Sequence, residues 1–235
     1  MKGLNQFFYF VVAFLFSSCN LLKEGNTYEL KNSKYKSTTK GNPEYFWVQF
    51  IDTAMILYPF LNKIEVNKNN PLYFSFNENS RPDSLTFLNL SKSCFDIDIL
   101  TIPFKYRPSV KKFPNQLNTN FSGAVYAGFR NDFYHFYFSA DPVGGQKREL
   151  KHFGFGFGIF SGFGSTAINS WTTQSQVQSE YDGFVFMNGV AGIIAVNKLT
   201  FGLGIGIDIL LDKNKSSWIY QHKPWVGFTV GLNLN

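Results

Sequence analysis

The stretch from Leu199 to Ile209 reads L-T-F-G-L-G-I-G-I-D-I, and it decides the fold. Every odd-numbered position holds a large apolar residue, and every even-numbered position holds threonine, glycine or aspartate. Strict alternation is typical of a β-strand, because successive side chains of a strand point to opposite faces. The stretch therefore predicts a strand with one apolar face and one small or polar face.

The same alternation recurs elsewhere in the chain. It is clearest in Val226–Asn235 (VGFTVGLNLN), Phe153–Ile159 (FGFGFGI) and Phe121–Phe129 (FSGAVYAGF). Extending the pattern between polar breaks predicts strands at residues 45–58, 94–106, 118–130, 133–140, 151–164, 182–196, 199–211 and 224–235. We therefore expect about eight antiparallel strands.

The composition limits the class of protein that these strands form. Charged residues make up 16% of the chain, below the roughly 25% of an average soluble domain, while aromatic residues reach 19%. The mean hydropathy of −0.11 excludes a bundle of membrane helices. Few charges, many aromatic residues and middling hydropathy favour strands that are apolar on one face only, as in a membrane β-barrel.

The N-terminus carries an export signal. Lys2 precedes an uninterrupted apolar run, Phe7–Phe16, which is too short for a transmembrane helix but suits a secretory signal. The run leads into Ser17, Ser18 and Cys19, which resembles the lipobox of bacterial lipoproteins. The resemblance implies that Cys19 is acylated and becomes the new N-terminus. The alternative is an ordinary signal peptide with an incidental cysteine.

These signals divide the chain into a signal peptide (1–18), a lipidated, disordered tether (19–43) and a β-barrel domain (44–235). Removal of the signal peptide takes away Lys2, so the net charge falls from +6 to about +5. In an exported protein, a positive balance suggests attraction to anionic lipid headgroups. The sequence contains no basic run long enough to predict nucleic-acid binding.

Strand length and chain ending favour an up-and-down transmembrane β-barrel over a soluble β-sandwich. Strands of this length match a tilted membrane crossing, and glycine and threonine on the second face suit the interior of a small barrel. The chain also ends on a strand rich in apolar residues, and in this it resembles outer-membrane barrels, whose last strand carries the assembly signal. A small barrel is filled by its own side chains and does not pass large solutes.

Short and long polar breaks predict the topology. Asn197-Lys198 and Asn131-Asp132 read as two-residue turns, whereas residues 165–181 and 212–223 read as long loops. Because outer-membrane barrels keep periplasmic turns short and external loops long, we place Asn197-Lys198 and both termini in the periplasm and the long loops outside.

The alternation also predicts a polar cluster inside the barrel, near its outer mouth. Asp96, Asp98, Arg130, His135 and Asp208 all fall on inward positions. Carboxylates in a narrow, low-dielectric interior are costly alone, so a guanidinium is the expected partner. We interpret the cluster as structural, filling the interior and fixing the register of the strands.

Four aromatic residues lie in or beside the predicted external loops: Trp171, Tyr181, Trp218 and Tyr220. They suit either an aromatic girdle at the membrane surface or a surface on which a ligand stacks.

Sequence patterns for catalysis, metals and cofactors are weak. Gly154-x-Gly156-x-Gly158 alternates with phenylalanine inside a predicted strand, so it does not indicate a phosphate loop. The three histidines lack metal-ligand spacing. His135 and Ser139 share a strand face and are the only pairing that suggests a hydrolytic site, and Cys94 reads as a packed residue. We therefore predict no cofactor, no metal and no catalytic residue.

The sequence thus predicts an outer-membrane β-barrel lipoprotein with a structural or interaction role. Its expected partners are outer-membrane lipid and other envelope proteins. One alternative is a soluble all-β lipoprotein, periplasmic or at the cell surface, that binds a protein or glycan. A third is a lipid-modifying outer-membrane enzyme.

Acylation of Cys19 is directly testable. A palmitate analogue supplied to expressing cells should label the wild-type protein and leave Cys19→Ser unlabelled, because the substitution removes the thiol that is acylated. Equal labelling of the two proteins would contradict the lipobox interpretation.

Overall fold

The computed structural model describes residues 30, 32–39, 44–51, 54–75, 87–110, 113–140, 146–197 and 199–232. The chain divides into two units, Met1–Asn32 and Ser33–Asn235, and every described strand lies in the second. The predicted signal peptide and Cys19 fall outside the described residues. Within the described ranges, no helix is long and apolar enough to cross a membrane.

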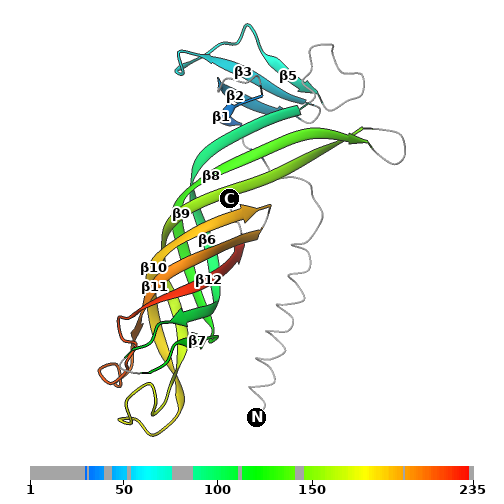
Figure 1. Ribbon diagram of the computed structural model, residues 1–235. Helices are drawn as coiled ribbons and strands as arrows, with labels where there is room; N and C mark the ends of the chain where they lie inside the picture. The colour runs from blue at the N-terminus through cyan, green and yellow to red at the C-terminus, as the bar shows by residue number, and fades with distance from the viewer. Residues whose placement is uncertain are drawn as a thin grey trace, which may run out of the picture. The chain divides into compact units, whose positions relative to one another are not determined.

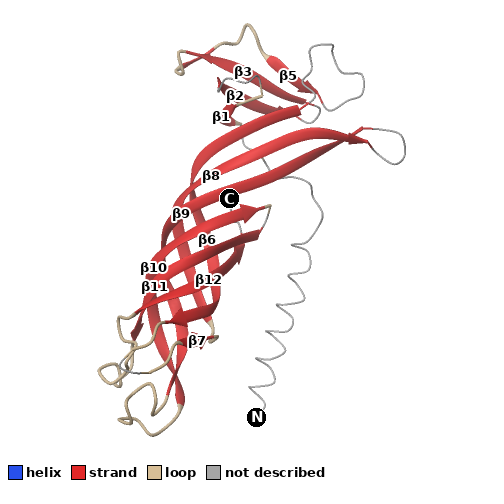
Figure 2. Ribbon diagram, in the orientation of Figure 1, coloured by secondary structure: helices blue, strands red, loops and turns tan. Residues whose placement is uncertain are grey.

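The prediction of an all-β antiparallel fold is confirmed (Figures 1 and 2). A single sheet contains twelve strands, and every pairing between them is antiparallel. The strands are β1 (Ser33–Ser37), β2 (Glu44–Ile51), β3 (Ala54–Leu61), β4 (Glu65–Val66), β5 (Leu72–Ser75), β6 (Phe87–Arg107), β7 (Gln116–Asn118), β8 (Ser122–Ala140), β9 (Gln146–Ile168), β10 (Tyr181–Val196), β11 (Leu199–Leu210) and β12 (Pro224–Leu232).

Six of these strands close into a ring. The order β6-β8-β9-β10-β11-β12 returns to its start because β12 also pairs with β6, from Val226 opposite Tyr106 to Leu232 opposite Ile99. A register shift in this last pairing lies between Phe228 and Val230, beside Pro103 of β6. Closure gives these strands hydrogen-bonding neighbours on both sides and leaves the ring no free edge.

The ring has two different ends. At one, the loop end, residues 169–180 connect β9 to β10 and residues 211–223 connect β11 to β12. At the other, the turn end, β10 and β11 are joined by two residues, with Val196 opposite Leu199 and Asn197 at a φ of 54°. Positive φ is the conformation that tight two-residue hairpin turns require.

Three ring strands continue past the turn end. Residues 87–91 of β6, 134–140 of β8 and 146–152 of β9 form, together with β1–β5, a region that we call the strand extension (Figure 1). In the extension β1 pairs with β6, Lys36 lying opposite Ser91, and β2, β3 and β5 follow outward from β1. The ring and the extension are thus one continuous sheet.

The inner face of the strand extension has its own apolar core. Its buried side chains are Tyr35, Phe46, Val48, Met55, Leu57, Phe74, Leu88, Leu90 and Phe136. Phe74 of β5 stacks on Phe138 of β8 with ring centroids 5.2 Å apart, so the sheet curls until its two sides meet. Burial of this kind stabilises a fold by roughly 25 cal/mol for each Å² of apolar surface.

The predicted number and limits of the strands need correction. The sequence predicted about eight strands in the barrel, whereas the ring contains six. Residues 45–58, predicted as one crossing strand, form the hairpin β2–β3 in the strand extension, where Ile51 lies opposite Ala54. Residues 59–92, predicted as a loop, include the end of β3, all of β4 and β5 and the start of β6.

The predicted turn at Asn131-Asp132 is wrong. Both residues continue β8, so the predicted strands 118–130 and 133–140 are one. Each side chain has a partner on the face to which the alternation assigns it: Asn131 accepts a hydrogen bond from Ser93 outside, and Asp132 pairs with Arg130 inside. Asn-Asp also lacks the glycine that two-residue hairpins favour.

The predicted tether extends too far along the chain. Ser33–Ser37, placed in the tether, form β1 and pair with β2 and β6. Two lysines in this short strand hid its alternation, because the apolar side chain between them is the single Tyr35. Tyr35 is 2% exposed, and burial above all raises the pKa of its phenol to about 12.

Steric crowding in the ring can be tested with two glycines. A Cβ atom on Gly204 would lie 3.1 Å from Cε1 of Phe160 inside the ring, whereas a Cβ on Gly192, which faces outward, would meet nothing within 4 Å. Gly204→Leu should therefore lower the free energy of unfolding by about 1–3 kcal/mol. Gly192→Leu should not lower it. Urea unfolding in detergent measures both, and equal midpoints would show that the inward face tolerates bulk.

Candidate functional site

Buried charged side chains gather at the turn end of the ring. In this turn-end cluster, Arg130 Nη1 lies 3.0 Å from Asp96 Oδ1, and Arg130 Nε donates to Asp132 Oδ1 at 2.9 Å. All three residues are at most 2% exposed. One guanidinium therefore bridges two carboxylates on neighbouring strands, β6 and β8, in a place that water does not reach.

Asp132 is the acceptor on which the turn-end cluster converges. His152 Nε2 lies 2.8 Å from Asp132 Oδ1, and Cys94 donates its thiol hydrogen to Asp132 Oδ2 at 3.1 Å. The His152 ring also stacks on Tyr134, with ring centroids 4.9 Å apart. Through these contacts Asp132 ties together β6, β8 and β9.

Glycines of β9 make room for this cluster. A Cβ on Gly154 would lie 2.6 Å from Asp132 Oδ1, and one on Gly156 would lie 3.3 Å from Cβ of Arg130. A Cβ on Gly158 would lie 2.8 Å from Cε2 of Tyr126. The three glycines of the Gly-x-Gly-x-Gly pattern thus leave room for the large inward side chains of β8.

A second cluster of charges lies near the loop end. In this loop-end cluster, Asp208 of β11 accepts hydrogen bonds from Lys105 Nζ at 3.1 Å, from Trp225 Nε1 at 2.9 Å and from Arg107 Nη2. Arg107 Nη1 also donates to Thr166 Oγ1 at 2.9 Å. Here two cations share one carboxylate, so the balance of charge is opposite to that at the turn end.

Aromatic rings complete the surroundings of these cations. Lys105 Nζ lies 4.8 Å from the centre of the Trp225 ring. Arg107 Cζ lies 5.2 Å from the centre of the Trp218 ring and 5.1 Å from that of Tyr220. Cation–π contacts of this kind are worth about 0.5–2 kcal/mol. Burial raises the pKa of the Tyr220 phenol, and the positive charge of Arg107 opposes that shift.

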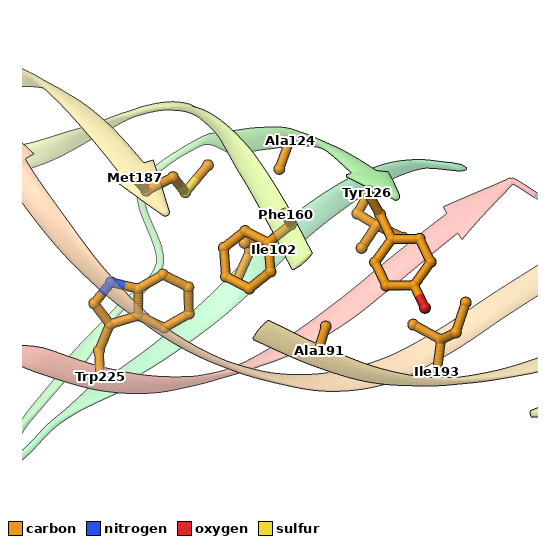
Figure 3. Close-up of a cluster of buried hydrophobic side chains, with 9 residues drawn as sticks. Ile102, Ala124, Tyr126, Phe160, Met187, Ala191, Ile193 and Trp225 are labelled. Carbon is orange, nitrogen blue, oxygen red and sulfur yellow. The ribbon is translucent and has the colours of Figure 1, made fainter. Parts of the chain in front are cut away.

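A layer of apolar side chains fills the middle of the ring (Figure 3). Its members are Leu100, Ile102, Ala124, Tyr126, Phe160, Met187, Ala191, Ile193 and Trp225, all at most 5% exposed. Phe160 and Trp225 lie with ring centroids 5.8 Å apart across the interior. Side chains from strands on opposite sides of the ring thus meet in its middle.

The loops cover the loop end of the ring. Trp218, Ile219 and Tyr220 of the β11–β12 loop are buried against Ile168, Val185 and Leu210 of the ring strands. A hydrogen bond also connects the two long loops: the Ile219 amide donates to the Thr172 carbonyl at 3.0 Å. The loop end is therefore capped by the protein itself.

The residues of the predicted polar cluster are distributed over several places. Asp96 and Arg130 are in contact, and Asp98 accepts a hydrogen bond from Thr200 Oγ1 at 2.9 Å. The prediction of a single cluster at the outer mouth is wrong for Asp208, which belongs to the loop-end cluster. Asp96 and Arg130 lie at the turn end instead, because Asn131-Asp132 is not an external turn.

The prediction that His135 points inward is also wrong. His135 is exposed on the outer face of the strand extension, where its Nδ1 contacts Asn89 Oδ1. The error follows from the expected turn, which reversed the assignment of faces after residue 132. Phe136, the next residue, is the one that points inside, and it is 2% exposed.

The four loop aromatics have different environments. Trp171 is 75% exposed, as an external contact residue must be, and Tyr181 donates its hydroxyl hydrogen to Asp212 Oδ2 at 2.6 Å. Trp218 and Tyr220 are 3% and 1% exposed, so their prediction as external contacts is wrong. They fold back over Arg107 because the loop that carries them caps the ring.

The described residues offer little for catalysis or metal binding. They contain no group of three or more histidine, cysteine, aspartate or glutamate side chains arranged to hold a metal ion. His135 and Ser139 are four residues apart in one strand, about 13 Å, and Ser139 instead donates to Glu149 Oε1 at 3.4 Å. The buried charges are paired with one another inside the ring.

Sequence reasoning missed four members of the two clusters: Lys105, Arg107, Asp132 and His152. Up to Ile102, the even-numbered residues of β6 face inward. After the register shift beside Pro103, the odd-numbered residues Lys105 and Arg107 face inward instead, and strict alternation cannot reveal such a shift. Asp132 was detectable, since the alternation of β8 runs through it without interruption.

Comparison with known proteins gives no relative. The chain matches no protein-family model, and neither a curated protein sequence nor a solved structure is detectably similar to it.

Loss of the central cation of the turn-end cluster should destabilise the protein. Arg130→Ala leaves Asp96 and Asp132 buried without their guanidinium, which typically costs about 3–5 kcal/mol. Lys213→Ala is the control, because Lys213 is exposed in the β11–β12 loop. Urea unfolding should show a much lower midpoint for Arg130→Ala alone, and equal midpoints for both variants would contradict a stabilising role for the ion pairs.

Proposed function

We propose that the ring spans the outer membrane of a Gram-negative-type bacterium as the barrel of a lipid-anchored envelope protein with a structural or interaction role. The observation that carries this proposal is the inverted polarity of the ring. Charged side chains are buried inside, while large apolar side chains are exposed outside. A soluble protein arranges the two kinds of side chain the other way round.

The apolar outer surface surrounds the ring. Leu203 of β11 is 65% exposed, Phe157 of β9 65%, Phe129 of β8 74% and Ile99 of β6 57%. Soluble monomers rarely expose a continuous apolar patch of more than a few hundred Å². A hydrocarbon environment removes the cost of exposing such a surface to water.

The height of the apolar band fits a bilayer. On β9 the exposed apolar residues run from Phe153 to Phe163, about 33 Å at about 3.3 Å a residue. A strand tilt of about 40° reduces this to a height of about 25 Å, which is the band of known outer-membrane barrels. On β6 and β8 the band ends near Phe95 and Phe133, beyond which Asn89 and His135 face outward.

Polar side chains within the band have hydrogen-bond partners inside the protein. Ser161 donates to Asn188 Oδ1 at 2.8 Å, and Thr101 donates to the Val230 carbonyl at 2.9 Å. Groups that face hydrocarbon need such partners, because no water is present to replace them.

The filled interior argues against a pore for large solutes. The apolar layer around Phe160 and Trp225 crosses the ring, and the loops cover one end. A structural or interaction role fits an interior of this kind better than transport.

The proposed orientation follows from the two ends. Outer-membrane barrels have short turns in the periplasm and long loops outside, so the turn end and the strand extension would be periplasmic. A lipid on Cys19 would then insert into the inner leaflet, on the same side as the extension.

A soluble all-β lipoprotein is the second candidate. The observation in its favour is the number of ring strands, because six is fewer than the eight to 26 or more of most single-chain outer-membrane barrels. In that case the apolar band would be covered by other envelope proteins instead of lipid.

An arginine on the apolar band separates lipid from water as the neighbour of the ring. Leu203→Arg should lower the free energy of unfolding in lipid vesicles by about 2–4 kcal/mol, because it places a charge near the bilayer midplane. Ile64→Arg, at an 85% exposed position in the strand extension, should change it little. The fraction of protein with heat-modifiable gel migration reports folding.

If the ring faces water, both substitutions merely replace an exposed apolar residue by a charged one. Both variants would then fold equally well without lipid, and the membrane proposal would be wrong.

A further inference from the structure

The strand extension carries an outward face rich in aromatic residues and lysines. Lys34 of β1, Trp47 of β2 and Tyr58 of β3 are directly opposite one another and form one row across three strands. Lys36 and Tyr45 begin the adjacent row. We call these five residues the aromatic-lysine face.

Lys34 of this face is held in place by its neighbours. Lys34 Nζ lies 4.9 Å from the centre of the Tyr45 ring and 4.5 Å from that of Phe60, and it donates to the Lys63 carbonyl at 2.7 Å. Trp47 is 39% exposed, and Lys34 and Lys36 are exposed. The contacts of Lys34 thus hold its side chain beside the Tyr45 ring before any ligand arrives.

The opposite side of the same strands carries the apolar core of the strand extension. Phe46, Val48, Met55 and Leu57 point inward and supply the apolar core. The only carboxylate in β1, β2 and β3 is Glu44, which the alternation assigns to that inner side. The outward face is therefore positive, with no acidic side chain from its own strands.

We propose that the aromatic-lysine face binds a glycan strand that bears carboxylates, the chemistry of cell-wall peptidoglycan. The rings of Trp47, Tyr45 and Tyr58 take the apolar faces of sugar rings, since aromatic side chains offer flat apolar area at little entropic cost. Lys34 and Lys36 pair with the carboxylates. The choice of peptidoglycan rests on the proposed function, which puts the extension in the periplasm.

The aromatic-lysine face lies near the edge of the proposed apolar band. Lys36 lies opposite Ser91, and Ser91 lies opposite Phe133, at which the band of β8 ends. Anionic lipid headgroups are therefore within reach of these lysines, and binding to phospholipid vesicles is measured beside binding to a glycan. What favours the glycan is the row of aromatic rings, which offers flat apolar area to sugar rings.

Co-sedimentation of the full-length protein in detergent with isolated peptidoglycan sacculi tests the proposal. We expect saturable binding that weakens with salt, and a dissociation constant raised at least about ten-fold by Trp47→Ala. Lys34→Gln and Lys36→Gln together should also weaken binding and reduce its salt dependence. The matched controls are Trp171→Ala and Lys213→Gln, exposed residues of the long loops, which should bind as wild type.

Several results would overturn the proposal. One is the absence of binding to sacculi by a protein whose heat-modifiable migration shows that it is folded. Another is equal binding of the Trp47 and Trp171 variants. Retention on vesicles of anionic phospholipid, lost in the Trp47 variant, would identify a lipid partner instead. Because gel migration reports the barrel and sedimentation reports the face, failure of either proposal is recognised separately.

Discussion

A ring of six strands encloses little volume, and filling that volume without overlap is the constraint on which the rest of the structure depends. Large inward side chains, such as Phe160, Tyr126 and Trp225, are possible only because glycines lie beside them. A Cβ on Gly206 would lie 2.6 Å from the Trp225 ring. The alternation of glycine with large outward residues is therefore one solution to two requirements, an apolar surface outside and space inside.

The charged clusters answer a second requirement of the same interior. A carboxylate that water does not reach must find all its partners within the protein. Asp208 meets this demand with three donors, and Asp132 with Arg130, His152 and Cys94. Because these partners come from different strands, each network also fixes the register of its strands. A slip by one residue would turn every inward charge to the outer face.

Period-two alternation was sufficient to predict an antiparallel β fold, the two-residue connection after Val196 and the contact between Asp96 and Arg130. It failed where local sequence is ambiguous. Asn131-Asp132 has the composition of a turn, and only contacts with Ser93 and Arg130 on the final sheet make it a strand. Lys105 and Arg107 lie beyond an irregularity at Pro103. Residues 45–58, predicted as one barrel strand, instead form the β2–β3 hairpin, because the pairing partners of a strand are decided by the whole chain and not by its own pattern.

The pairing of β12 with β6 also has consequences for the order of folding. Neighbouring strands from β8 to β12 are consecutive in the chain, so each can pair as soon as the next is present. The contact between Val226 and Tyr106 instead joins distant parts of the chain, and pairs of such high contact order form slowly. Until they form, β6 and β12 are unpaired edges open to association with other chains. Pairing of β12 with β6 is thus the folding step at which a partner or chaperone would have most influence on the yield of native protein.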